Sequence, residues 1–552
     1  MATHLDSELL FTFELGKGSD APRFRVVKFE GTEAISQLFR FDITLVSDQA
    51  DIDLDAAMQS QATLRIYTRD HSRSTPYHGM LSSIEQLGKV DDYVFYHATL
   101  VPRLWVLGLN RVNDVYLDEK NIPDLIAGIL ERNDLKSPNV SFMLKNPGTY
   151  RERSFTCQFQ ETDLAFVSRW MEQEGLYYFF RHEGEQAGSD VMVITDYREA
   201  HPSQALELRY TPPENVQTDR QDTCVTSFIC RKTHVPAKVL VQDFNFRKAS
   251  LGDNLKAEQT VAGGDRGEVM FYGDNLRREE DAQRIATMRA EELASQATVF
   301  NGEAPAIGVR AGYFMALSSH YRTDFNDRYL VTRVRHQGSQ TGVVLAGQNT
   351  AYNANEQGSI YQCSFSAIKA SLQYRAPRST PKPVIAGFLS AIIDSEGDGQ
   401  LAELNEYGQY KVQLMYDYSS KSANKGSSWL RMATPYAGKH EGMHFPLLKG
   451  TEVLIGFSGG DPDQPIILGA VPNSENQSII RDINAACNAV RTVSGNVMNM
   501  VDRPGKEGVM MHSPVASSYV YIGSFPIAGD DATPSDSKKE KGSDPVALIN
   551  SL

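Results

Sequence analysis

The first part of the chain has a hydrophobic pattern with a period of two. In Phe39-Arg-Phe41-Asp-Ile43-Thr-Leu45 apolar and polar residues alternate, and Phe24–Val26 and Val27–Phe29 show the same tendency. Such alternation is typical of strands with one buried face. Residues 1–375 are therefore predicted to form a mainly β region with a few inserted helices.

Three segments of this region instead repeat apolar residues at helical spacing. The first follows Asn121, a suitable N-cap, and its apolar residues recur at i, i+3, i+4, i+7 and i+8. The second covers about Thr162 to Glu174 and is followed by Gly175, where a glycine commonly ends a helix. The third covers about 278–296. Carboxylates on these helices, such as Glu172 and Glu174, are expected to be solvated.

The pattern changes after residue 375. Three prolines between Pro377 and Pro383 remove backbone donors and stiffen the chain, so 376–383 is predicted to be a linker. Short alternating strands separated by Gly, Asp and Pro follow over 384–473. Five short strands at this spacing favour a small closed barrel of the oligonucleotide/oligosaccharide-binding (OB) type.

The last part of the chain differs again. After a connector, 474–487, residues 488–523 contain short strands and turns, and no later helix or sheet covers them. Strands of this kind cannot bury their apolar faces or open edges alone, so we expect them to pair with other copies in an intertwined, needle-like β structure. The expected needle residues are Val493, Val497, Met500, Val509, Met511, Val520 and Ile522.

Residues 524–552 form a polar segment with an apolar end. Ser, Asp, Gly and Pro surround Lys538-Lys-Glu-Lys541, and Val546-Ala-Leu-Ile549 follows. This composition is typical of a flexible tether. The residues expected to contact a cap or effector at the tip are Tyr521, Gly523, Val546, Leu548 and Ile549.

Composition and charge exclude several protein classes. The 552 residues are 41% hydrophobic and 22% charged, as in ordinary globular proteins, and the formal net charge is −14. An acidic chain argues against binding to nucleic acid or to an anionic membrane surface. We expect no secretory leader at the N-terminus, no transmembrane helix and no disulfide framework among the five cysteines.

Candidate chemistry is sparse. Asp394-Ser-Glu396-Gly-Asp398-Gly399 begins like a calcium loop, but Asn405 stands at position twelve, where such loops have glutamate, and a polar turn is favoured. The fourteen residues of the connector and the 29 of the tail are too few for a catalytic domain. We therefore expect no enzyme activity, no cofactor, no metal and no catalytic residue.

Several longer motifs stand out along the chain. The longest is Arg151 to Phe179, with Glu161, Asp163 and Gly175. Others are Phe29–Phe39, His78-Gly79, Glu406–Val412, Ser428–Arg431 and Gly460-Asp461-Pro462-Asp-Gln-Pro465. Together these motifs resemble one family, the VgrG spike proteins of bacterial type VI secretion systems, which are related to phage tail hub and spike proteins.

This resemblance implies a homotrimer with a hub of β-barrel domains, an OB-fold neck and a short C-terminal trimeric β-helix or β-prism. It implies as partners an Hcp tube ring at the hub base, baseplate components, and a PAAR-type or Rhs-type cap or effector at the tip. It also implies assembly in the cytoplasm, export by the secretion machinery without a signal peptide, and transient membrane contact on puncture.

Two other functions stay open at this stage. A phage-type tail hub and spike would share the same physics in a virion. A binding module for carbohydrate or nucleic acid would need a basic, aromatic face on the barrel, for which Tyr410, Lys411, Tyr416 and Trp429 are candidates.

Overall fold

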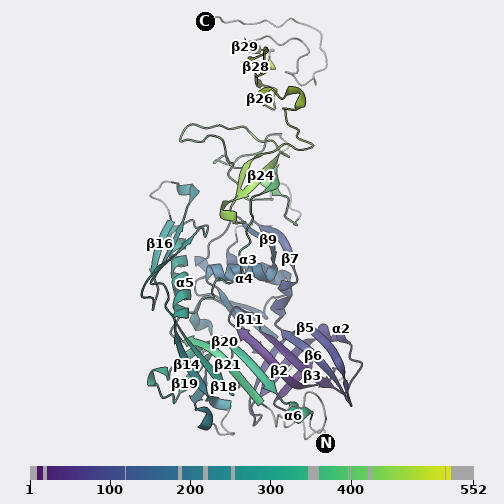
Figure 1. Ribbon diagram of the computed structural model, residues 1–552, viewed down its shortest axis with the longest axis vertical. Helices are drawn as coiled ribbons and strands as arrows, with labels where there is room; N and C mark the ends of the chain where they lie inside the picture. The colour runs from purple at the N-terminus through teal and green to yellow at the C-terminus, as the bar shows by residue number, and fades with distance from the viewer. Residues whose placement is uncertain are drawn as a thin grey trace. The chain divides into compact units, whose positions relative to one another are not determined.

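The computed structural model describes residues 9–16, 21–117, 120–184, 189–215, 222–249, 255–345, 360–395, 397, 400–419, 426–515 and 518–523. Figure 1 shows these as ribbon. By its internal contacts the described chain divides into two units. The first unit comprises Met1–Gly387, Tyr416–Lys421 and Phe457–Pro465, and the second comprises Phe388–Met415, Ser422–Gly456 and Ile466–Leu552.

A large sheet forms the base of the first unit (Figure 1). One part of it closes on itself in the order β1-β4-β5-β6-β3-β2, because β1 pairs with both β4 and β2. These strands are Phe11–Leu15 (β1), Phe24–Ala34 (β2), Arg40–Ser47 (β3), Gln61–Tyr67 (β4), Ser74–Val90 (β5) and Tyr93–Val101 (β6). The alternation around Phe39–Leu45 is thus confirmed as a strand of a closed barrel.

The other part of this sheet starts at β20, which pairs with β2. From β20 the pairing runs one way through β19 and β12 to β13, and the other way through β21 and β18 to β14. Only Thr226 separates β13 from β14, so the chain itself brings the two ends together. These strands are Ala205–Tyr210 (β12), Cys224–Val225 (β13), Ser227–Lys232 (β14), Thr298–Ala304 (β18), Phe314–Ser318 (β19), Arg328–Ser339 (β20) and Ile360–Lys369 (β21).

Close packing between paired strands depends on glycine at two points. A Cβ atom on Gly31 would lie 2.1 Å from the ring of Phe41, and one on Gly338 would lie 2.2 Å from the ring of Phe29. Both distances are far below van der Waals contact, so the missing side chains let the rings lie across the barrel strands.

Two helices pack with small sheets in the first unit. Helix α3 (Ile122–Arg132) begins at Asn121, whose side chain accepts from the Asp124 N–H, and helix α4 (Asp163–Glu174) ends at Gly175 with φ of 75°. Both confirm the predicted helices. The accompanying strands are Arg111–Tyr116 (β7), Val140–Met143 (β8), Thr156–Thr162 (β9), Tyr177–Glu183 (β10) and Ser189–Thr195 (β11).

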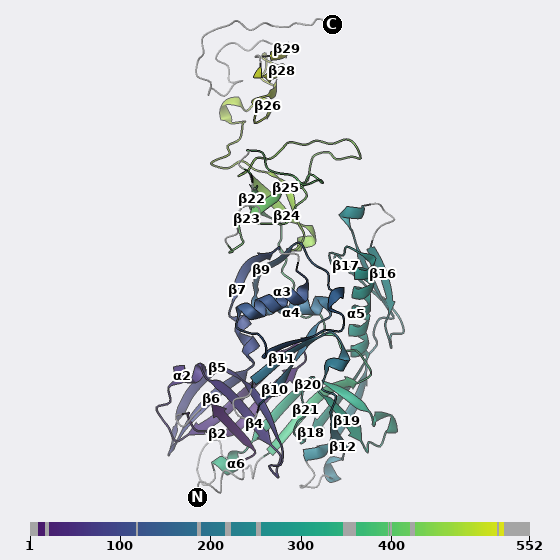
Figure 2. The same ribbon diagram turned by 180° about the vertical axis from the view of Figure 1, so that it is seen from behind.

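The third predicted helix is α5 (Glu279–Ala297). It covers one face of a sheet made of Lys238–Asp243 (β15), Leu255–Thr260 (β16) and Glu268–Tyr272 (β17), as Figure 2 shows from behind. Ala282, Ile285 and Ala286 of the helix pack with Val239 and Val241 of the central strand. Short helices lie at Leu54–Met58 (α2) and Thr341–Val344 (α6).

The second unit contains the predicted barrel region. Its sheet has the order β23-β22-β24-β25, from Phe388–Asp394 (β22), Lys411–Leu414 (β23), Glu452–Phe457 (β24) and Pro465–Ala470 (β25). Residues 429–432 pair only through isolated bridges, Tyr410 with Leu430 and Met432 with Ile467. Across the described ranges, no helix combines the length and the apolar composition that crossing a membrane would require.

Candidate functional site: the C-terminal sheet

Residues 487–523 of the second unit, apart from 516–517, form an antiparallel meander. Its strands are Cys487–Arg491 (β26), Val497–Val501 (β27), Gly508–Ser513 (β28) and Ser518–Gly523 (β29), and each pairs with the next. We call this meander the C-terminal sheet. The prediction treated these strands as isolated; within one chain they pair with each other because short turns connect them.

The register divides the side chains between two faces. Residues opposite one another share a face, and successive residues alternate. One row is Asn488, Met500, Val509 and Ile522, and a second row on the same side is Val490, Met498, Met511 and Val520. Seven of these eight side chains are apolar, and we call this side the apolar face.

The apolar face is exposed to solvent in a single chain. The exposed fractions are 38% for Val490 and Met498, 39% for Met500, 48% for Met511, 55% for Val520 and 66% for Ile522. Burial of apolar surface is favourable by about 25 cal/mol of free energy for each Å² removed from water. A continuous apolar face of this kind marks an interaction surface.

The opposite side is mixed and better covered. It carries the half-buried apolar residues Val497, Val501 and Met510 as well as polar ones. Asn499 is only 4% exposed, and its side-chain oxygen has no hydrogen-bond partner among the described residues. His512 stacks on Tyr519, with ring centroids 4.4 Å apart. The sheet therefore leaves its apolar face more exposed than its mixed side.

The structure sorts the predicted needle residues. Five lie together on the apolar face: Met500, Val509, Met511, Val520 and Ile522. Val497 lies on the opposite side, and Val493 is in the turn between β26 and β27 and is 52% exposed. Sequence reasoning missed Val490 and Met498, although the alternation Met498-Asn-Met500 places both methionines on one side.

The predicted tip residues divide in another way. Tyr521 is half-buried on the side of the sheet opposite the apolar face. Gly523 has φ of 108°, and a Cβ there would lie 2.5 Å from the Glu507 carbonyl oxygen, so this residue closes the pairing with Gly508. Val546, Leu548 and Ile549 lie outside the described residues.

In the first unit, the expectation of solvated carboxylates on α4 is wrong. Glu172 is 7% exposed and accepts hydrogen bonds of 2.8 to 3.1 Å from the backbone and hydroxyl groups of Ser379 and Thr380. The predicted linker is therefore held at this point on the first unit. Glu174 is 3% exposed and pairs with Arg153 at 2.9 Å and with Arg284.

The Gly460–Pro465 motif, which lies within the range predicted as the barrel, packs in the first unit. The Asp463 carboxylate accepts from the Cys157 N–H at 2.7 Å, and Lys382 lies 2.7 Å from Asp461 and 3.5 Å from Asp463. Burial, together with the Asp461 charge, raises the pKa of Asp463. This motif is thus a polar attachment point within the first unit.

The prediction of no metal site missed one sequence pattern. His440-Glu441-Gly442-Met443-His444 has the spacing of a zinc-binding HExxH motif. That motif needs a helix, which places both imidazoles on one face. Here Ala437 bridges Gly442 and the Glu441 carboxylate accepts from the His440 N–H, so the segment is a hairpin. The required helical geometry is missing in this described segment.

The barrel offers little to a nucleic-acid or carbohydrate ligand. Tyr410 is 1% exposed, and its hydroxyl accepts from the Leu447 N–H. Tyr416 belongs to the first unit and contacts Phe159, with ring centroids 5.3 Å apart. Among the candidates named from the sequence, only Lys411 and Trp429 form a pair of the kind that a basic, aromatic face requires. The Lys411 Nζ lies 5.0 Å from the centroid of the Trp429 ring.

Two family models match the chain. Residues 32–342 match the phage tail baseplate hub (GPD), and residues 403–471 match the type VI secretion system/phage-baseplate injector OB domain. The second match confirms the predicted OB-type barrel.

Curated relatives extend the likeness over most of the chain. The type VI secretion system spike protein VgrG5 of Pseudomonas aeruginosa is 30% identical over 507 residues, which are 89% of this chain and 62% of the relative. VgrG1b of the same organism is 28% identical over 88% of this chain and 65% of the relative. The actin cross-linking toxin VgrG1 of Vibrio cholerae is 25% identical, with 44% of its length covered. The chain thus spans less than two thirds of the length of these relatives.

Solved structures share the fold. The E. coli c3393 protein, described as a type VI secretion component similar to the T4 tail proteins gp27 and gp5, has a TM-score of 0.58 at 21% identity, over 83% of this chain and all of that one. The Francisella PdpA–VgrG complex has a TM-score of 0.59 at 11% identity, over 91% of this chain and 84% of that one. The predicted resemblance to VgrG is confirmed.

Proposed function

Because the chain belongs to the phage tail baseplate hub family, we propose that it is the trimeric spike of a contractile type VI secretion apparatus, which punctures target membranes and carries cap or effector proteins. The curated spike relatives, similar over 88–89% of the chain, favour this setting over a phage virion. Neighbouring genes for a sheath and a tube protein, as opposed to a capsid and a portal, would decide between the two.

The observation that carries the proposal is the exposed apolar face of the C-terminal sheet. Three copies that turn these faces toward a common axis would form a three-sided prism with a closed apolar interior. The methionines, valines and isoleucine of the face would fill that interior, and the mixed sides would face outward. A single chain has no other described element over this face.

The proposed mechanism transmits force and includes no catalytic step. Contraction of a sheath drives the trimer outward, and a narrow tip concentrates the force. In the prism every strand is hydrogen bonded along its length, so backbone bonds share the load. Three copies carry a formal net charge of −42, three times −14, so the apolar contacts must outweigh this repulsion.

The finer parts of the proposal concern partners and location. An Hcp ring would bind the hub base, baseplate components would surround it, and a PAAR-type or Rhs-type protein would cap the tip. The trimer would assemble in the cytoplasm, leave through the secretion machinery without a signal peptide, and contact the membrane only during puncture. The acidic net charge supports a protein that does not bind nucleic acid.

We assign cargo binding to the C-terminal end of the chain. Tyr521, Gly523, Val546, Leu548 and Ile549 are the proposed contacts, and deletion of 524–552 is expected to abolish co-purification of the cap or effector while the trimer stays intact. Loss of the trimer in the same variant would contradict this assignment. The chain itself would have no catalytic activity, since only 474–487 separate the barrel from the C-terminal sheet.

The mass in solution tests the spike. Light scattering of the full chain is expected to give about 184 kDa, three times 61.4 kDa. Val520→Asp places a charge on the apolar face and should give the 61.4 kDa monomer. Val493→Asp is the matched control, because this equally exposed valine lies in a turn and should leave the trimer intact.

A monomeric parent chain at micromolar concentration would refute the trimer. Equal masses for the two variants would instead refute the assignment of the interface to the apolar face, because the two substitutions differ only in position.

A further inference from the structure

Three methionines lie together on the apolar face of the C-terminal sheet. Met498 of β27 is directly opposite Met511 of β28, and Met500 is two residues from Met498 on the same strand. Residues directly opposite each other have Cβ atoms about 4.5–5.5 Å apart, and residues two positions apart in a strand share one face. The three thioethers therefore form one group, which we call the methionine cluster.

The methionine cluster is accessible in a single chain. Its members are 38% (Met498), 39% (Met500) and 48% (Met511) exposed, whereas Met171 and Met315 in the core of the first unit are 2% and 1% exposed. An oxidant must reach a thioether before it can react with it. The unassembled chain thus offers the cluster to an oxidant that cannot reach the core methionines.

The reaction of a methionine with hydrogen peroxide is a two-electron oxidation. The thioether sulfur forms a bond to one peroxide oxygen while the O–O bond breaks, so that the sulfur is oxidised and the peroxide is reduced. The departing oxygen takes up both peroxide protons and leaves as water. The product is a sulfoxide, which is polar where the thioether was apolar.

The apolar face has few groups that could bind a sulfoxide oxygen. The cross-strand neighbours of the cluster include Val490, Val509 and Val520, whose side chains donate no hydrogen bond. Asn488 is opposite Met500, but its amide already donates to Asp502 at 2.6 Å. A polar oxygen enclosed on this face would lose its hydrogen bonds to water without replacement, so burial of the oxidised face is unfavourable.

We propose that the methionine cluster is an oxidation site that controls assembly of the chain. A hydroperoxide oxidises the cluster in the unassembled chain, and the sulfoxides then prevent the apolar face from packing in the trimer. An assembled trimer encloses the same face and protects the cluster. The block is reversible, because reductases convert methionine sulfoxide back to methionine. This inference rests on the proposed trimer and adds a site at which oxidation stops its formation.

Substitutions that imitate the two oxidation states test the site in the full chain. Glutamine at Met498, Met500 and Met511 together introduces polar groups, as the sulfoxides do, and should raise the concentration at which trimers dissociate by roughly a hundredfold or more. Leucine at the same three positions is the matched control. It has a similar volume without sulfur and should keep the mass near that of the trimer, about 184 kDa or three times 61.4 kDa. A glutamine variant that dissociates no more easily than the leucine variant would overturn the inference.

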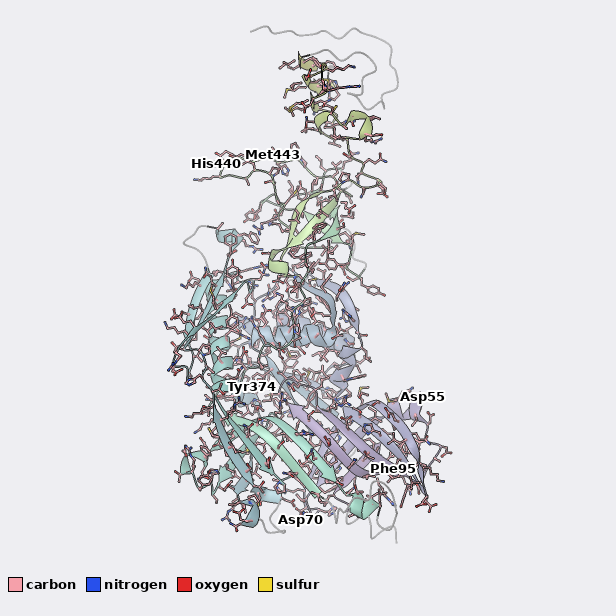
Figure 3. The ribbon with its side chains drawn as sticks, in the orientation of Figure 1. Asp55, Asp70, Phe95, Tyr374, His440 and Met443 are labelled. Carbon is pink, nitrogen blue, oxygen red and sulfur yellow. The ribbon has the colours of Figure 1, made fainter. Side chains whose placement is uncertain are left out.

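Hydrogen peroxide tests the chemistry itself. The parent should lose its trimer during treatment, whereas the leucine variant, which retains every other methionine, should not. Peptide mass spectrometry should find the cluster oxidised about tenfold or more faster in the monomeric Val520→Asp variant than in the trimeric parent, because the trimer must first open. Met443, which is labelled in Figure 3 and is 44% exposed outside the C-terminal sheet, should react equally in both.

The outcomes separate this inference from the proposed function. A parent that stays trimeric after its cluster is oxidised, or a leucine variant that dissociates as the parent does, would overturn the oxidation site and leave the spike standing. A cluster that reacts as fast in the parent trimer as in Val520→Asp would contradict its enclosure by the trimer. A parent that is monomeric without peroxide would refute both proposals.

Discussion

The first unit and the C-terminal sheet use buried and exposed positions in opposite ways. The first unit buries charged groups: Arg169 and Glu161 are 4% and 7% exposed and form an ion pair at 2.7 Å. The C-terminal sheet exposes apolar groups such as Val520 and Ile522. A buried charge is tolerated only with its partner present, and the first unit supplies that partner from the same chain, whereas no described element covers the apolar face of the sheet.

The largest expected contrast comes from one substitution made in both regions. Val334→Asp in β20, at a side chain that is 0% exposed, should prevent folding of the first unit, because a carboxylate in an apolar core costs more than a typical domain's stability. Val520→Asp should leave that unit folded. Fluorescence of Trp170, which is 0% exposed in the first unit, during denaturant titration separates the two results.

If Val520→Asp also lowered the unfolding midpoint seen by this fluorescence, the C-terminal sheet would stabilise the first unit and the comparison would break down. The unfolding midpoints of the variant and the parent should be compared at a protein concentration at which Val520→Asp is monomeric and the parent is trimeric. The comparison should then be repeated after both proteins have been diluted.

Breaking one buried ion cluster tests whether the first unit depends on its internal pairs. Burial opposes ionisation of Glu174, but the charges of Arg284 and Arg153 outweigh it and lower the pKa of Glu174 to about 2. Glu174→Gln leaves both guanidinium groups without this charge and should destabilise the unit by about 3–5 kcal/mol. Glu183→Gln, which removes the exposed partner of Arg181, is the control, with a change below about 1 kcal/mol.

Acid should weaken the first unit through a buried histidine. His201 is 3% exposed, and burial lowers its pKa to about 4 even though its ring bonds to the Gly312 carbonyl. The unfolded chain then binds a proton near pH 6.5 that the folded chain refuses, so stability falls as pH decreases from about 6.5 to about 4, by up to about 3 kcal/mol. His201→Gln should flatten this part of the profile; an unchanged slope would exclude the histidine as its source.

The smallest expected effect concerns an exposed pair on the first unit. Arg40 lies 2.8 Å from Asp42, but its side chain is 60% exposed. Arg40→Ala should cost less than about 1 kcal/mol, and 1 M salt should remove most of the difference. A larger loss would show that the unit depends on surface charge as well as on buried pairs.

Local patterns predicted the elements of both regions. Asn121 begins one helix and Gly175 ends another where the sequence indicated, because a cap depends only on residues within a few positions of it. The alternation around Phe39–Leu45 predicted a half-buried strand for the same reason. The sequence also predicted uncovered apolar positions in the short strands of 488–523, and five of the seven residues that it named lie on the apolar face.

What sequence could not predict depends on distant partners. In the sequence, Glu172 has the pattern of an exposed charged residue on a helix. In the structure, Ser379 and Thr380, more than 200 residues later in the chain, pack against its carboxylate and bury it. Val493 and Val490 are equally apolar, and only the register of β26 with β27 places Val490 on the apolar face and leaves Val493 in the turn.

The return of Phe457–Pro465 to the first unit has a consequence for synthesis on the ribosome. The 78 residues between Gly387 and Pro465 take about 4 to 16 seconds to translate at roughly 5–20 residues per second. During that interval the Cys157 N–H and the Arg169 guanidinium lack their contacts with the Asp463 carboxylate, because Asp463 has not yet been synthesised. The first unit therefore cannot form all of its contacts from its N-terminal 387 residues alone.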